Sequence, residues 1–360
     1  MIDMGFSIWY NIIVCFFGGV ALSIYFGNIA GNRQLLDRLG REILSESLPH
    51  AHIIEGEEGS GRRSIALAAA AALSCTDRNS EQLPCGKCSA CRKIFGGLTP
   101  DVIRLTTGRD KQSIGVDEAR FIRSDIVTLP NDFDYKVYII ENADKMTPQA
   151  QNALLLTLEE PPKYAYFFLI CRSASAMLET VRSRAPVLRT RPLDDRELAD
   201  YIITNNKQAE ALSQSSPEEF AELIRSSSGC IGQALRLLDP KERQPMLEKR
   251  HLARDFVMSY DRMVPAGEKI ALISRFSSKR EEVITQLEFA VSALRDLAVL
   301  KKAEDAPLLF WTDRDYALEI SERFTLAALL SLIERTNNAA DALERNANLR
   351  LTLTNLILSP

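Results

Sequence analysis

The chain has 360 residues, of which 46% are hydrophobic and 26% charged, a composition typical of globular proteins and a length sufficient for two or three domains. Its formal net charge of -4 at pH 7 argues against a protein that holds nucleic acid mainly through its own basic surface. Any contact with DNA is therefore expected to be local or supplied by partners.

An apolar run extends from Phe6 to Phe26 and is long enough to span a bilayer. No Lys or Arg precedes it, which disfavours a secretory signal peptide. Two interpretations stay open. The run could be a membrane span whose following arginines keep the rest of the chain cytoplasmic (Arg33, Arg38, Arg41), or it could be upstream sequence translated in frame. We favour the second, because the family resemblance described below begins near Phe26.

The next part of the chain alternates between helical and extended patterns. Short apolar runs between helices predict a parallel sheet that is covered on both faces. We expect helices at Arg33–Ser47, Ser64–Ser74 and Pro148–Glu160, the last capped by Thr147, and strands at Ala51–Glu55, Val102–Leu105, Tyr135–Ile140, Tyr166–Ile170 and Val187–Thr190.

Beyond residue 191 only helical patterns remain. The first group predicts a small helical lid, and the remainder predicts a separate helical domain, with helices at Asp194–Asn205, Pro217–Ser226, Gln233–Leu238, Val283–Leu300, Phe324–Ile333 and Ala339–Leu358. We therefore expect an N-terminal extension, an α/β domain, a lid and an all-α domain, with boundaries at 1–25, 26–190, 191–242 and 243–360.

Four of the seven cysteines, Cys75, Cys85, Cys88 and Cys91, fall within one short stretch. Three of them form a C-x-x-C-x-x-C sequence, and the fourth follows a predicted helix. Four thiolates with no open coordination position are typical of a structural zinc site. Such a zinc would stabilise an inserted segment that is too small to have a hydrophobic core of its own. The alternative of four free core cysteines is disfavoured by the polar and glycine neighbours. Cysteine use of this kind indicates a metal module at residues 75–91 and a reducing compartment such as the cytoplasm.

The turn after the first predicted strand resembles a phosphate-binding loop. Gly56, Gly59 and Gly61 give it the required freedom, and the strand-turn-helix context is correct. However, the loop ends in Arg62 and Arg63, where an active loop needs Lys followed by Ser or Thr. Arg62 could still hold a phosphate, but Arg63 cannot ligate magnesium. We interpret this turn as a degenerate nucleotide site, and ATP is expected not to bind or not to be hydrolysed.

A second departure lies at the end of the strand that precedes Asn142. An ATPase of this type needs Asp followed by Glu, to hold magnesium and to polarise water. The chain has Glu141 and Asn142 instead. Glu141 could replace the first acid at longer reach, but Asn142 cannot act as a base. This loss and the loss in the loop point the same way, towards a chain without hydrolysis of its own.

These residues resemble a known family, the AAA+ clamp-loader subunits of bacterial DNA polymerase III, with the delta-prime and gamma/tau types as close relatives. The resemblance covers the chain from about Phe26 to its end. Its most specific block is Asn152–Pro162, and the other matching pieces are 48–51, the four cysteines, 113–120, 143–147, Arg182-Ser183-Arg184, 232–236 and 346–351.

The resemblance implies an AAA+ module, a lid and a helical collar that joins subunits into a ring. It favours the delta-prime type, since gamma/tau would keep Lys with Ser or Thr in its loop. In that type an arginine is offered to a neighbour's ATP, and the matching residue here is Arg184, although Ala185 stands where the family has Cys. The implied partners are gamma/tau and delta subunits in a hetero-oligomer, with the sliding clamp and primer-template DNA bound through the complex.

Three alternatives remain at this point. The chain could be an active gamma/tau-type ATPase that uses Arg62 in place of Lys. It could be a zinc-dependent DNA-binding module, which its acidic balance disfavours. It could also be a membrane-anchored AAA+ regulator, if the apolar N-terminal run is inserted.

Overall fold

The computed structural model describes residue 26 and residues 29–78, 83–107, 113–260 and 264–358. The chain divides into two units. The first contains the N-terminal part as far as Tyr201 together with Gly229–Gln233, and the second contains Ile202–Ser228 and everything from Ala234 onward. The predicted apolar run lies outside the described residues except for Phe26. Within the described ranges, no helix is both long and apolar enough to cross a bilayer.

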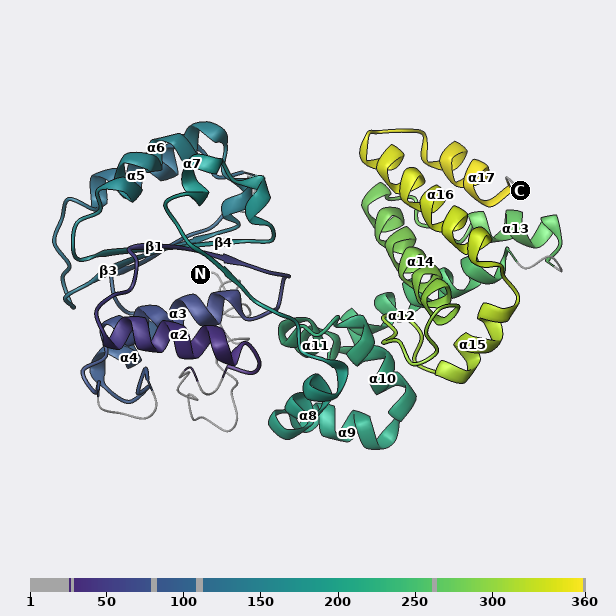
Figure 1. Ribbon diagram of the computed structural model, residues 1–360, viewed down its shortest axis with the longest axis horizontal. Coiled ribbons are helices and arrows are strands. Elements are labelled where there is room, and N and C mark those ends of the chain that lie inside the picture. The colour runs from purple at the N-terminus through teal and green to yellow at the C-terminus, as the bar shows by residue number, and fades with distance from the viewer. Residues whose placement is uncertain (1–25, 27–28, 79–82, 108–112, 261–263, 359–360) are drawn as a thin grey trace, which may run out of the picture. The chain divides into compact units, whose positions relative to one another are not determined.

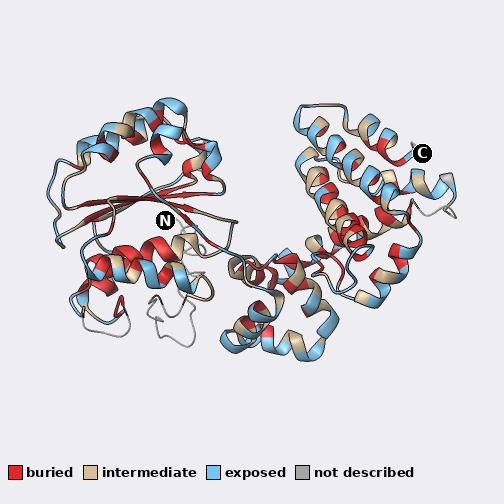
Figure 2. Ribbon diagram, viewed as in Figure 1, coloured by how far each residue is buried: buried red, intermediate tan, exposed pale blue. Residues whose placement is uncertain are grey.

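A five-stranded, all-parallel sheet forms the centre of the first unit, in the order β2-β3-β4-β1-β5. Every residue of β3 and β4 is buried, which explains why these segments have continuous apolar runs rather than alternation (Figure 2). The sequence placed all five strands within one residue at either end, and their bounds are β1 Ala51–Glu55, β2 Val102–Leu105, β3 Lys136–Glu141, β4 Ala165–Cys171 and β5 Val187–Arg189.

Helices cover both faces of this sheet, as the sequence predicted. One face carries α2 (Arg33–Leu44), α3 (Arg62–Leu73) and α4 (Ser89–Phe95), and the other carries α5 (Val116–Asp125), α6 (Pro148–Glu159) and α7 (Glu179–Arg182) (Figure 1). Two apolar cores result, one on each face. Short 3₁₀ turns at Ala143–Lys145 and Ala174–Ala176 follow β3 and β4.

The start of α3 differs from its predicted position at Ser64. The helix begins at Arg62, because Gly61 adopts a left-handed conformation (φ 87°) and serves as its N-cap. Its alanines are completely buried, since small side chains let the helix approach the sheet closely. Arg62 and Arg63 therefore lie in the first turn of a buried helix, at the carboxyl edge of the sheet.

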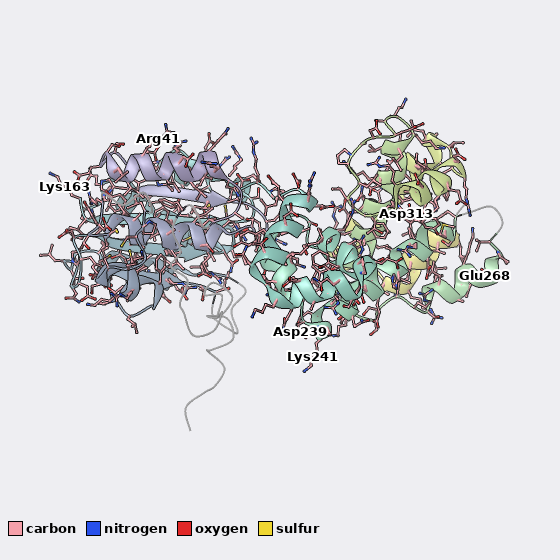
Figure 3. The ribbon with its side chains drawn as sticks, turned by 90° about the horizontal axis from the view of Figure 1, so that it is seen from below. Arg41, Lys163, Asp239, Lys241, Glu268 and Asp313 are labelled. Atoms are coloured by element: carbon pink, nitrogen blue, oxygen red, sulfur yellow. The ribbon has the colours of Figure 1, made fainter. Side chains whose placement is uncertain are left out.

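From residue 195 onward the chain is helical. The elements are α8 Asp195–Asn205, α9 Lys207–Ser215, α10 Pro217–Ser226, α11 Ile231–Leu237, α12 Pro240–Met258, α13 Ala266–Ile273, α14 Arg280–Leu300, α15 Arg314–Glu322, α16 Leu326–Glu344 and α17 Leu349–Leu358. Asp239 and Asp313 cap α12 and α15 by accepting the backbone N–H groups of Lys241 (2.9 Å) and Tyr316 (3.1 Å) (Figure 3).

One prediction in the helical unit is wrong. Two helices were expected between Phe324 and Leu358, with a break between Ile333 and Ala339. Instead α16 is continuous through this stretch, because Thr336 and Ala339 face the apolar core that α14 and α16 share. The break lies at Asn346, which adopts a left-handed conformation (φ 67°).

Candidate functional site

Cys75, Cys85, Cys88 and Cys91 come together on one side of α3. Cys75 follows the end of α3, Cys85 lies in the loop, and Cys88 is the N-cap of α4. All four sulfur atoms lie within 4.8 Å of one another, and the Cys75–Cys88 and Cys85–Cys91 pairs are each 4.0 Å apart. A tetrahedral zinc with Zn–S bonds of about 2.3 Å requires sulfur separations of about 3.8 Å. The cluster is therefore close to the geometry of a four-coordinate metal site, and its wider sulfur pairs would close by up to about 1 Å around zinc.

The surroundings favour the thiolate at Cys88 and oppose it at Cys75 and Cys91, where burial raises the pKa. Backbone N–H groups of Cys85, Lys87, Cys88 and Cys91 point to neighbouring sulfurs at 3.3–3.4 Å. Burial opposes ionisation of Cys88, but N–H donors from Cys91 and Thr76 outweigh it and lower its pKa to about 6. Three of the four cysteines are buried. The predicted cluster is confirmed as a group able to bind a metal such as zinc.

The predicted phosphate loop is a closed turn at the carboxyl end of β1. A side chain at Gly56 would collide with the hydroxyl of Thr190 at 1.8 Å. Gly59 (φ 86°) lies against the backbone of Gly232, whose N–H donates to the Gly59 carbonyl at 3.0 Å. A Cβ at Gly59 would come within 2.9 Å of the Gln233 nitrogen. The loop thus keeps its glycines, and the 229–233 segment covers it directly.

Arg62 occupies the position of the missing lysine. Its guanidinium donates to the backbone carbonyl of Cys171, the last residue of β4 and the strand neighbour of Glu55. Burial lowers its pKa, against the raising effects of Cys171, Asp144, Glu58 and Glu57. In this arrangement Arg62 ties the loop to the adjacent strand.

Arg63 forms an ion pair with Glu141, the acid that ends β3. The other carboxylate oxygen of Glu141 accepts from Nε and Nη2 of Arg104 in β2, at 3.2 and 2.6 Å. Glu141 is buried, whereas each arginine side chain is about one-third exposed. The structure thus brings the two predicted site residues together, and both oxygens of the acid are held by guanidinium groups.

Sequence reasoning missed Arg104. The only signal in the sequence was a charged residue within an otherwise apolar strand. Its register against Ile139 places it on the strand beside β3, so its side chain reaches Glu141 at the sheet's edge. Pairing of this kind depends on strand order, which the sequence did not reveal.

Arg184 lies just beyond α7, in a separate place from the loop arginines. Its Nη1 donates to the Thr180 carbonyl (2.6 Å) and to the Ser183 hydroxyl (3.2 Å), and its Nη2 forms an ion pair with Glu159 at the end of α6. The side chain is 33% exposed. Arg184 is therefore at the surface and is held by residues of its own chain.

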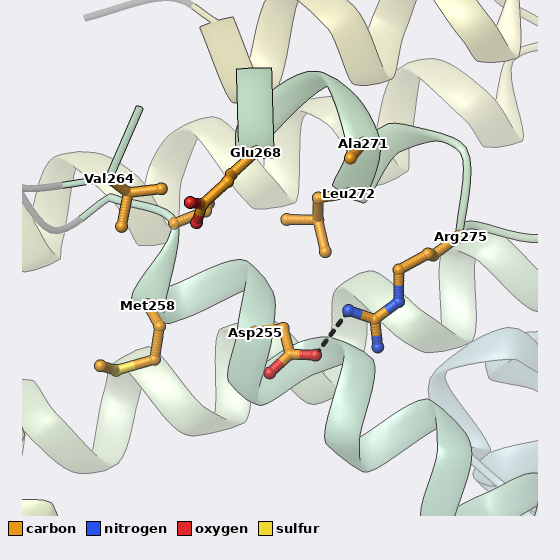
Figure 4. Close-up of a pocket in the computed structure, with 8 residues that line it drawn as sticks. Asp255, Met258, Val264, Glu268, Ala271, Leu272 and Arg275 are labelled. Carbon is orange, nitrogen blue, oxygen red and sulfur yellow. Dashed lines mark ion pairs between the residues drawn. The ribbon is translucent and has the colours of Figure 1, made fainter. Parts of the chain in front are cut away.

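A recess of about 410 Å³ lies in the helical unit and contains none of the predicted site residues. An ion pair between Asp255 and Arg275 (2.7 Å) crosses part of its lining, and Glu268 stands opposite (Figure 4). It is open to solvent, and its two acids and one base carry no arrangement that favours catalysis.

Together, the parallel sheet, the glycine loop between β1 and α3 and the acid at the end of β3 define a P-loop-type α/β domain of the AAA+ class, with a four-cysteine insert. Residues 31–194 match a protein family described as DNA polymerase III, delta subunit. Over this region the chain is similar to the DNA polymerase III clamp-loader subunits of the delta' and gamma/tau types.

The chain is also similar to individual proteins. The chain is 31% identical over 215 residues to DNA polymerase III subunit tau of Bacillus subtilis, covering 59% of this chain and 37% of that protein. It is 30% identical over 203 residues to subunit delta' of the same organism, covering 52% and 60%. The match thus spans less than two thirds of either relative. A gamma subunit-related protein from Thermotoga maritima is 19% identical in structure comparison, with a TM-score of 0.44 and coverage of 90% of this chain and 97% of that one.

Proposed function

We propose that this protein is a non-hydrolysing, delta'-type subunit of the DNA polymerase III clamp loader. In this role it offers Arg184 to the ATP bound by a neighbouring subunit, and it contributes no ATP turnover of its own. Its partners are gamma/tau and delta subunits in a cytoplasmic hetero-oligomer, which acts on a sliding clamp and primer-template DNA. The proposed domains are the α/β module at 26–190, a lid at 191–242 and a collar at 243–360.

The observation that carries the proposal is the arrangement around Glu141. A hydrolysing site needs an acid that is free to hold magnesium and a hydroxyl that completes its coordination. Here Arg63 takes the place of the hydroxyl residue and neutralises the acid together with Arg104. A divalent cation would have to enter beside two guanidinium groups, which repel it.

The partly exposed position of Arg184 supports the proposal that this residue reaches the ATP bound by a neighbouring subunit. A guanidinium that stabilises charge on a transferring phosphoryl group must lie where another subunit can reach it. Arg184 is partly exposed, and its acidic partner Glu159 is exposed too. Arg63 is as exposed as Arg184 but pairs with the buried Glu141, and Arg62 donates to the backbone carbonyl of Cys171. The four cysteines would hold a structural zinc, with no open position for chemistry.

Equilibrium binding of ATP and ADP to the full chain, with Mg²⁺ present, tests whether the chain lacks ATP hydrolysis of its own. We expect no magnesium-dependent binding and no phosphate release, with about one zinc per chain in the same sample. Tight magnesium-dependent binding with turnover would instead favour a gamma/tau-type ATPase, to which the similarity with subunit tau also points.

A reconstituted clamp-loader complex tests the proposed role of Arg184 in ATP hydrolysis by a neighbouring subunit. Replacing Arg184 with Ala in a complex assembled from the full chain and its cognate gamma/tau and delta subunits should lower the ATPase rate by a factor on the order of 10³. An unchanged rate of ATP hydrolysis and clamp loading would contradict the proposed role of Arg184.

A further inference from the structure

Glu159 is the one acidic residue that contacts Arg184 among the described residues. It is the last residue of α6, and its Oε1 forms the ion pair with Nη2 of the arginine. Two further acceptors, the Thr180 carbonyl and the Ser183 hydroxyl, hold Nη1 from the other side. Two neighbours in sequence thus hold one end of the guanidinium, and Glu159, from a different helix, holds the other.

The guanidinium of Arg184 keeps N–H donors beyond those used in these three contacts. The group has five N–H donors in a planar fork, and the contacts with Thr180, Ser183 and Glu159 employ three of them. Two donors are left for an incoming oxyanion. A planar group that is already held in one orientation loses less conformational entropy when it binds phosphate than one on a free side chain.

We propose that Glu159 is a positioning residue that orients Arg184 for a phosphate group bound on a neighbouring subunit. This inference rests on the proposed function, because it assigns a support to the arginine on which that function depends. Glu159 acts only through Arg184 and does not touch the nucleotide. The effect of Glu159 on the rate of ATP hydrolysis should be modest. The side chains of Arg184 and Glu159 are 33% and 41% exposed, and solvent weakens their attraction.

The test compares full-length variants in the reconstituted complex. We expect Glu159→Ala to lower kcat for ATP about two- to fivefold, which is the range of equilibrium effects of exposed ion pairs, while the KM for ATP stays unchanged. Glu159→Gln keeps an acceptor oxygen and should restore part of the rate. Glu160→Ala is the matched control, because this adjacent exposed acid is not one of the three acceptors.

A double variant separates positioning from general structural damage. In the Arg184→Ala background, Glu159→Ala should have no further effect on kcat. Equal effects in both backgrounds would overturn the inference, and so would an increase in kcat or an unchanged kcat for Glu159→Ala alone. If Arg184→Ala itself leaves turnover intact, the proposed function fails first. That result is distinct from a failure of Glu159 alone.

Discussion

Arg63, in the first turn of α3, forms an ion pair with Glu141, the last residue of β3, across the end of the intervening strand β4. In an active loop a hydroxyl and an acid at these two places would share a magnesium ion. Here the guanidinium stands where the cation would be needed. One substitution in the loop therefore changes both the ligand set and the charge of the site.

Replacement of Glu141 by Ala should destabilise the protein. It would leave Arg63 and Arg104 close together without their common acceptor, although each is about one-third exposed and can regain water. We expect a loss of about 1–3 kcal/mol in the free energy of unfolding, measured by urea denaturation. Glu160→Ala, on an exposed acid, is the control. A loss no larger than that of the control would mean that the cluster contributes nothing to stability.

Removal of one cysteine should abolish metal binding. Cys85→Ser breaks the four-sulfur set, and zinc content should fall from about one equivalent per chain to near zero. The unfolding temperature should fall as well, because the metal joins the end of α3 to the start of α4. Ser89→Ala, a change at the exposed first residue of α4, should retain zinc. Full zinc content in Cys85→Ser would contradict the predicted ligand set.

His52 predicts a pH dependence of stability. It is fully buried in β1, stacks on Phe168, and its ring nitrogens have no hydrogen-bond partner among the described residues. Burial lowers its pKa to about 4, while Glu42 acts to raise it and Arg38 to lower it. The unfolded chain, with a His pKa of about 6.5, binds this proton first as the pH falls.

Stability from neutral His52 should therefore be fully present above about pH 6.5 and decline towards pH 4, by up to about 3 kcal/mol. His52→Leu should flatten this part of the pH profile, which denaturant unfolding at several pH values would measure. His251→Gln, at a half-exposed histidine, should leave the profile unchanged. A profile that is identical for wild type and His52→Leu would contradict the assignment.

Asp296 should be a stability determinant of the helical unit. It is completely buried in α14 and accepts the backbone N–H groups of Leu309, Phe310 and Trp311 at 2.7–3.3 Å. Asp296→Ala would leave the buried N–H groups of Phe310 and Trp311 unsatisfied, and we expect a loss of about 2–4 kcal/mol on denaturant unfolding. Asp305→Ala, in the exposed part of the same connection, should cost less than about 0.5 kcal/mol.

Local pattern alone was enough to locate the strands, the glycine turn and the four cysteines. Continuous apolar runs are typical of parallel strands that are buried on both faces, and thiols at C-x-x-C spacing converge within one turn. The same pattern reasoning failed at α16, because packing against α14 carries that helix through residues that favour a break.

The chemistry at the loop was decided by tertiary structure. The sequence showed that Arg63 and Glu141 depart from an active site, but it did not show that they pair with each other or that Arg104 joins them. Strand order determines which side chains meet at the sheet's edge, and no local pattern encodes it. Likewise, only the fold brings Glu159 and Arg184 together, because the contact joins the ends of two different helices across 25 residues of chain.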